Sequence, residues 1–368
     1  MSSRWRWQLA VLLIFFIVTP DLLASSLEVL PPMVADDFDR QGLCACNALE
    51  TFANQSFDIE LLPYRRTGNF FVAVNWLLDI SNVCGFSLKL PVFMRGWNGT
   101  SVLIRSAPKA LNVSAAVSVE CNRLKKKHTV QGIWSAFVQK GKKYGNLKRG
   151  VQALPDATHL LKMQCVRKWL NVCSDQCRSH WKPNVLVLHI RQDDIFRENF
   201  NPNVHKKYGQ PPLSYYVRAM TFQQWDMVHV IAQNTSHKSP IFMAIEILQN
   251  FSRSPIMIHQ RSWPEDMCMM LCSYNFIASH SSLSLVWRAG LARRYFTSQC
   301  PPKILPDLLT RHYYEIKVNP GYKPTTRHDN SAENWVHHLL HQAQGPYPCS
   351  TGQLSSRARY PPMQVSLT

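Results

Sequence analysis

The feature that most constrains the fold is an alternation of short apolar runs and helical segments in the second half of the chain. Residues 185–188 and 227–231 are unbroken apolar runs, of the kind found in strands that a parallel sheet buries on both faces. Strands that alternate with helices predict a doubly wound parallel sheet, and therefore an α/β fold. Further strands are expected at residues 256–258 and 276–278, and helices at residues 241–248, 264–271 and 283–292.

The first half of the chain carries a similar but weaker signal. Residues 68–82 have the apolar periodicity of a helix, and Gly85 is suited to its end. Residues 86–90 have the composition of a strand that stops at Pro91. A second α/β layer is therefore expected in this half.

The N-terminus has the layout of a secretory signal. Arg4 and Arg6 precede an apolar run at residues 9–18, and small residues follow it. The run is ten residues long, shorter than the roughly 20 residues that span a bilayer. Residues 1–24 are therefore expected to be a cleaved signal peptide, or a signal anchor that holds the chain to the membrane through residues 7–24. Both alternatives place the rest of the chain in the lumen of the endoplasmic reticulum or Golgi, as a secreted or type II membrane protein.

Cysteines and glycosylation signals agree with a luminal address. The chain has eleven cysteines, and disulfides persist in oxidising compartments. Their spacings are not those of a zinc ribbon, so structural disulfides are expected, and the odd count leaves at least one cysteine unpaired or joined to another chain. Asn-X-Ser/Thr sequons, none with proline in the middle, occur at Asn54, Asn98, Asn112, Asn234 and Asn250.

The formal net charge is +18, which favours a polyanionic partner. The densest stretch of lysine and arginine is residues 123–149. Two interpretations stay open for it: a solvated basic loop, or a docking surface for an acidic glycan or a phosphate-bearing donor. Nucleic-acid binding conflicts with the secretory signal and the sequons.

The residues that directly follow the strand at 185–188 point to chemistry. They read His-Ile-Arg-Gln-Asp-Asp, and ligands of open α/β sheets bind just beyond the carboxyl ends of the strands. Arg191 offers a planar, permanently charged fork that suits diphosphate oxygens and stabilises charge on a leaving diphosphate. His189 is expected to orient a donor, and Asp194 to hold the loop or Arg191. The alternative is a strand that simply ends in polar residues.

Two further segments are candidate parts of a binding site. Ser281 and Ser282 stand at the expected N-terminus of the helix at 283–292, where backbone donors favour phosphate; the alternative is an ordinary helix cap. Residues 208–216 contain two prolines, which suit a rigid loop that opens a helix. Tyr208 and Tyr215 are weaker candidates for stacking on a sugar ring, and the alternative is a loop that packs over the sheet edge.

Two blocks of this sequence resemble a known enzyme family. Val-Leu-His-Ile-Arg-Gln-Asp-Asp is similar to the His-X-Arg-X-Gly-Asp motif of the fucosyltransferase superfamily that forms α1,2, α1,6 and protein O-fucose links. Trp-Pro-Glu-Asp-Met at 263–267, followed by His-Ser-Ser-Leu-Ser at 280–284, is similar to its later donor block. The resemblance covers roughly residues 183–297, and more faintly residues 68–91.

The resemblance implies a GT-B fold, in which two Rossmann-like doubly wound domains face a cleft. Residues 41–182 would be the acceptor domain and residues 183–345 the nucleotide-sugar domain. A stem at 25–40 and a disordered tail at 346–368 would flank them. It also implies GDP-fucose as donor, a glycan or glycoprotein acceptor and no bound metal. The roles that it implies are catalysis and diphosphate binding for Arg191, donor contact for His189, base or ribose pairing for Asp266, and phosphate binding for Ser281 and Ser282.

Two positions depart from the family pattern. Asp193 stands where the motif has glycine, and Leu283 where an aromatic residue usually follows the serine pair. A side chain and a negative charge at position 193 oppose the close approach of a phosphate. A second hypothesis is therefore a secreted or luminal glycan-binding protein on a catalytically inactive GT-B scaffold.

Overall fold

A computed structural model of the chain describes the residues on which the following account rests. They are residues 49–51, 59–61, 67–90, 102–104, 114–126, 129–130, 144–154, 156–170, 174–191, 210–232, 239–250, 252–259, 263–279, 290–300, 312–319 and 338–349.

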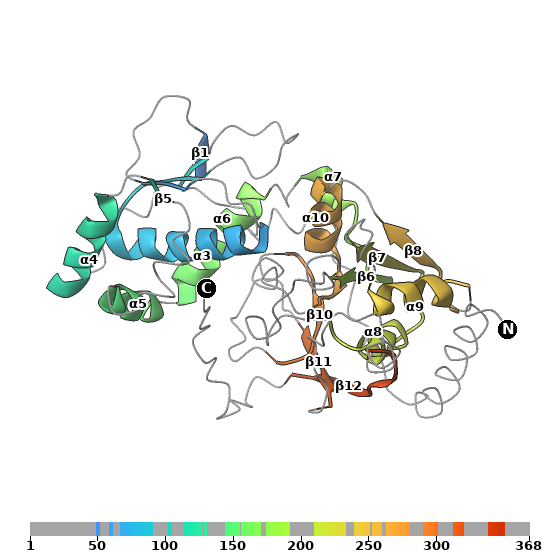
Figure 1. Cartoon of the computed structure of the whole chain (residues 1–368). Coiled ribbons are helices and arrows are strands. Elements are labelled where there is room, and N and C mark those ends of the chain that lie inside the picture. The colour runs from blue at the N-terminus through green and yellow to red at the C-terminus, as the bar shows by residue number, and fades with distance from the viewer. Residues whose placement is uncertain are drawn as a thin grey trace.

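The second half of the chain forms a seven-stranded, mostly parallel sheet (Figure 1). Its order is β12-β11-β10-β9-β6-β7-β8, and every neighbouring pair is parallel except β11 and β12. Counted from β6, this is the order 3-2-1-4-5-6 of a Rossmann sheet with one antiparallel strand added. The predicted parallel sheet is confirmed. The strands are β6 (Val185–Ile190), β7 (Met227–Ala232), β8 (Ile256–His259), β9 (Asn275–Ile277), β10 (Arg294–Thr297), β11 (His312–Val318) and β12 (Ala343–Pro348).

Helices cover both faces of this sheet because successive side chains of a strand point to opposite faces. Leu186 and Leu188 of β6 share a core cluster with the helices α8 and α9, whereas Val187 belongs to the cluster that contains α7 and α10. The sheet is therefore doubly wound. The helices are α7 (Asp175–Arg178), α8 (Leu213–Met220), α9 (Pro240–Leu248) and α10 (Trp263–Cys272).

The first half contains a smaller sheet of five strands in the order β1-β4-β3-β2-β5. β2 is parallel to β3 and β5, but β4 is antiparallel to both of its neighbours. The smaller sheet is therefore mixed, whereas the larger one is mostly parallel. Only 11 residues separate Leu90 from Val102, fewer than the dozen or more that a parallel crossover needs. The strands are β1 (Leu49–Thr51), β2 (Ile59–Leu61), β3 (Leu88–Leu90), β4 (Val102–Ile104) and β5 (Thr129–Val130).

Helix α3 (Thr67–Cys84) is the element to which the other helices of this half attach. It ends as its sequence predicts: Gly85 takes a φ of 61°, and its N–H donates to the Ser81 carbonyl oxygen at 2.9 Å. A disulfide from Cys84 to Cys121 joins it to α4 (Ala115–Lys125). The remaining helices here are α5 (Gly145–Gln152) and α6 (Asp156–Trp169).

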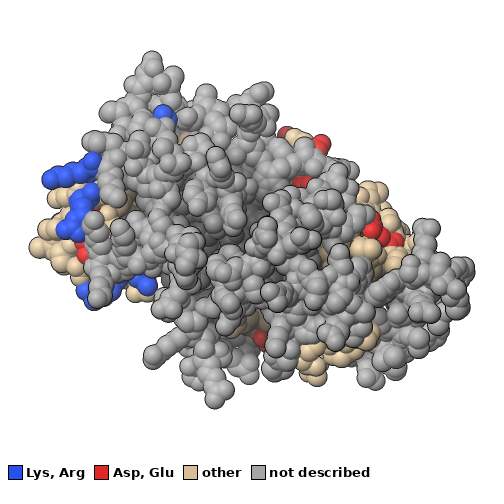
Figure 2. Space-filling view, in the orientation of Figure 1, with Lys and Arg blue, Asp and Glu red and all other residues tan. Residues whose placement is uncertain are grey.

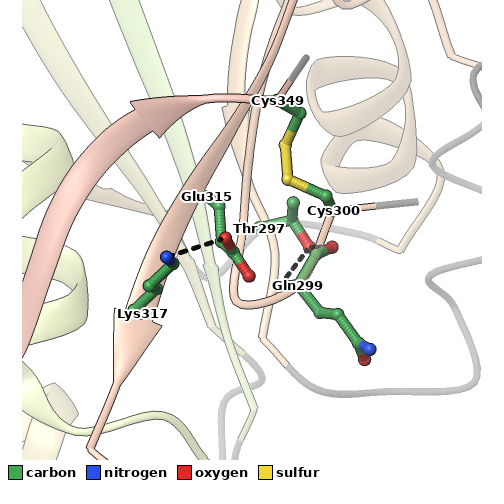
Figure 3. Close-up of a disulfide and its surroundings, with 6 residues drawn as sticks. All are labelled: Thr297, Gln299, Cys300, Glu315, Lys317 and Cys349. Carbon is green, nitrogen blue, oxygen red and sulfur yellow. Dashed lines mark hydrogen bonds and ion pairs between the residues drawn. A yellow bond between two sulfur atoms is a disulfide. The ribbon is translucent and has the colours of Figure 1, made fainter. Parts of the chain in front are cut away.

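The C-terminal end of the described chain corrects two sequence expectations. Of the tail expected to be disordered at 346–368, residues 346–349 are described: β12 continues to Pro348, and Cys349 forms a disulfide with Cys300 (Figure 3). Residues 350–368 lie outside the described residues. Of the helix expected at 283–292, only residues 290–292 are described, and they are not helical. The Leu291 N–H there donates to the Leu271 carbonyl oxygen across the core, which a helix would not allow.

The cysteines behave in part as expected. Cys177 of α7 pairs with Cys268 of α10, which fastens two helices on one face of the larger sheet. Cys272 is a buried thiol that lies outside the disulfides, in keeping with the odd cysteine count, and burial raises its pKa. No helix within the described ranges is long and apolar enough to cross a membrane.

A buried ion pair between α3 and α6 offers a test of this arrangement. The Lys162 Nζ lies 2.8 Å from Asp79 Oδ1 and 2.9 Å from Oδ2, and both side chains are less than a tenth exposed. Replacing Lys162→Met alone leaves the Asp79 carboxylate buried without its cation and is expected to lower the free energy of unfolding by about 3–5 kcal/mol. The double variant Lys162→Met/Asp79→Leu should recover most of that loss. Urea unfolding measures both, and equal losses in the single and double variants would contradict the pairing.

Candidate functional site

The candidate site lies at the carboxyl end of β6, beside the point where the strand order of the sheet reverses. β6 pairs with β7 on one side and with β9 on the other. The chain continues from β7 to β8 and from β9 to β10, and these two connections run outward in opposite directions. Open α/β sheets bind ligands in the crevice at such a point. His189 is the fifth residue of β6, and Arg191 follows its last residue. The structure therefore brings these two predicted residues to the position where a ligand is expected.

His189 is buried against β9. Its Nδ1 lies 2.9 Å from the Ser279 Oγ, just beyond the end of β9. Burial, and secondly the positive charge of Arg191, lower the pKa of His189 to about 3. The imidazole is therefore neutral at neutral pH, with one ring nitrogen able to donate and the other to accept a hydrogen bond.

The backbone of Arg191 is fixed by a buried hydrogen-bond network. Its N–H donates to the Gln210 Oε1 at 3.0 Å, and Gln210 is fully buried. The Gln210 Nε2 donates to the Tyr216 hydroxyl, which in turn donates to the His189 carbonyl oxygen at 3.4 Å. A buried network thus fixes the chain as it leaves β6, and the Arg191 side chain is partly exposed at the edge of the sheet.

Asp266 lies at the same edge of the sheet. β8 ends at His259, and α10 begins four residues later, so the first turn of α10 stands at the carboxyl ends of the strands. Asp266 is in that first turn and is 6% exposed. The structure thus places Asp266 on the same edge as His189 and Arg191.

Tyr215 does not have the exposure that a sugar contact needs. Its side chain is fully buried in the core beneath the sheet, and its hydroxyl donates to the carbonyl oxygens of Ala278 and Phe296 at 3.2 and 3.4 Å. The alternative, a packing role, is what the structure shows. Helix α8 begins directly after Pro212, as expected, and its first turn directs Tyr215 inward.

Several predicted site residues lie outside the described residues. They are Asp193, Asp194, Tyr208, Ser281 and Ser282, together with the sequons at Asn54, Asn98, Asn112 and Asn234. Asn250 is described: it is exposed just after α9, as a glycosylated asparagine must be.

Sequence reasoning missed two residues that build the site, Ser279 and Gln210. Ser279 follows the end of β9, so the rule that ligands bind beyond strand ends would have marked it, as it marked Arg191. Nothing in the sequence indicates that Gln210 lies against β6, because 19 residues separate it from Arg191. A pair of histidines on β7 and β8 was missed too: the His229 Nδ1 lies 2.7 Å from the His259 Nε2.

The arrangement is suited to binding a ligand that carries negative charge. Arg191 supplies a cation at the sheet edge, and the neutral His189 beside it supplies hydrogen bonds without a second charge. Within the described part of the chain, no three His, Cys, Asp or Glu side chains are grouped as metal ligands.

The low pKa of His189 predicts a pH dependence of stability. In the unfolded chain a histidine binds a proton below about pH 6.5, whereas folded His189 stays neutral down to about pH 3. The unfolded state therefore takes up the extra proton, and stability falls as the pH drops between these values. Between pH 7 and 5.5 the wild type should lose about 1 kcal/mol more than His189→Gln. Urea unfolding at both pH values measures the difference, and parallel losses would mean that folded His189 is protonated.

Comparison with known proteins gives no relative from which a function could be transferred. No protein-family model, no curated protein and no solved structure has a significant match to this chain.

Proposed function

We propose that the chain is a glycosyltransferase of the secretory pathway that transfers fucose from GDP-fucose to a glycan or glycoprotein acceptor. The observation that carries this proposal is the position of Arg191, at the carboxyl end of β6 beside the reversal of strand order. Its chain position is held by the buried Gln210. The resemblance of the sequence around it to the fucosyltransferase motif selects the donor.

The proposed role of Arg191 follows from the charge that develops in the reaction. As the bond between the sugar and the diphosphate breaks, negative charge grows on the leaving phosphate oxygen. A cation aimed at that oxygen stabilises the transition state more than the ground state. A rigid backbone near Arg191 helps because a site that is already in place has little to reorganise during the reaction.

His189 has a complementary role in this proposal. A charged imidazole next to Arg191 would compete with it for the same phosphate, but burial keeps the His189 ring neutral. The contact with Ser279 fixes the orientation of the ring, so His189 orients the donor by a hydrogen bond. Asp266, on the same edge, pairs with the base or ribose, Ser281 and Ser282 complete the phosphate site, and Asp194 holds the loop or Arg191.

The presence of two sheets supports this proposal, because a GT-B enzyme has two such halves. In the proposal, the half with the larger sheet binds the donor and the half with the smaller sheet binds the acceptor. Disulfides in both halves, Cys84–Cys121 and Cys177–Cys268, favour an oxidising compartment. The exposed sequon at Asn250 agrees with passage through the secretory pathway.

Calorimetric titration of the luminal fragment with GDP and GDP-fucose tests the donor site. Saturable binding is expected, weakened by Arg191→Ala by at least tenfold because a charge-assisted contact to phosphate contributes about 1.5–3 kcal/mol. Arg253→Ala is the matched control: Arg253 is exposed near the start of β8, at the opposite end of the sheet. Absence of binding to folded wild type, or equal losses in both variants, would contradict the donor site.

A second hypothesis, a glycan-binding protein that has lost turnover, is favoured by one observation, Asp193 in place of the motif glycine. The two hypotheses differ in whether GDP is released from GDP-fucose. Under the transferase hypothesis, the wild type releases GDP when acceptor glycans are added, and Asp193→Gly raises that rate. Glycan binding without GDP release, in the wild type and in Asp193→Gly alike, would favour the glycan-binding protein.

A further inference from the structure

A positively charged surface lies on the first half of the molecule, away from the candidate site. Figure 2 shows the blue side chains gathered over α4 and α5. We call this the α4–α5 surface. Four of its five members are exposed and Lys125 is partly exposed. They are Arg123, Lys125, Lys126, Lys148 and Arg149.

No acidic side chain on these helices balances the charge. From Cys121 to Leu154 the sequence has nine lysine and arginine residues and no aspartate or glutamate. Glu120 is the acid nearest to this stretch on α4, and it is buried. Its Oε2 accepts from the Leu147 N–H at 2.7 Å, and its Oε1 from the Asn146 side chain at 2.9 Å. Because Glu120 caps α5 and is buried, its carboxylate is not exposed on this surface.

The same contacts hold the two helices rigidly together. Glu120 connects α4 to the start of α5, and the Cys84–Cys121 disulfide connects α4 to α3. Gly150 of α5 lies so near α3 that a Cβ added there would be 3.4 Å from the Val83 Cγ1. The basic side chains therefore extend from helices whose relative positions are already fixed, which lowers the entropy cost of binding a long ligand.

We propose that the α4–α5 surface binds an acidic polysaccharide that carries repeated sulfate or carboxylate groups. Such a chain presents anions at intervals, which suits several cations spread over two helices. Arg123 and Arg149 can engage sulfate or carboxylate oxygens with two parallel hydrogen bonds, and the lysines act as point charges. The disulfide that supports the surface is typical of oxidising compartments, where polyanionic sugars rather than nucleic acids are met.

This inference goes beyond the proposed transferase activity and does not depend on it. The surface is built on helices of the smaller sheet's half, whereas Arg191 and His189 belong to the larger sheet.

The test is retention of the intact luminal fragment on immobilised heparin, eluted with sodium chloride. The variant Arg123→Gln/Lys126→Gln/Lys148→Gln is expected to elute at lower salt and to bind soluble heparin about tenfold more weakly, because three exposed ionic contacts are lost. The matched control is Arg253→Gln/Lys182→Gln/Lys317→Gln, which removes the same charges from exposed positions elsewhere. The control should elute close to the wild type.

Three results would overturn the proposal. If the wild type is not retained on immobilised heparin, the surface binds no such polysaccharide. Equal shifts in the two triple variants show that retention follows net charge alone. Duplex DNA or phosphatidylserine vesicles that compete with heparin at equal charge show that the surface does not select a polysaccharide. GDP-fucose binding is measured on the same variants, so failure of the donor site and failure of this surface are told apart.

Discussion

The larger sheet depends on the burial of β6 on both of its faces. All six residues of this strand are buried, and it pairs with β7 on one side and β9 on the other. A strand in that position needs helices above and below it, which α8, α9 and α10 supply. The same burial has a chemical consequence at the end of the strand. The polar side chains that follow β6 lie at the edge of a desolvated core. In such surroundings, one hydrogen bond or one charge contributes a large interaction energy.

The candidate site illustrates that consequence. His189 is neutral because the sheet buries it, and Ser279 meets it because β9, not β7, lies beside it on that side. Gln210 precedes α8 and Tyr216 lies within it, yet they bond to the backbone of Arg191 and His189. The site is therefore supported by three segments distant in sequence.

The smaller half has a different organisation. Its strands are two or three residues long, so side-chain contacts between helices hold it together: a buried Lys162–Asp79 ion pair, the Cys84–Cys121 disulfide and the capping of α5 by Glu120. Because Glu120 of α4 is buried and used internally, the exposed charges of α4 and α5 are positive. Fold stability and surface charge are thus linked through a single residue, Glu120.

The sequence by itself determined the buried strands β6 and β7, the helix α3 with Gly85 at its end, and the basic and polar residues after β6. Each of these follows from local hydrophobicity or from the conformational freedom of one residue. It did not reveal β10 to β12, in which polar and apolar residues make short mixed patterns. Only the tertiary structure decided that β9 lies beside β6, that Cys177 pairs with Cys268 and that Tyr215 is a core residue. These depend on contacts between segments far apart in the chain, and a local pattern does not record which distant segment will cover it.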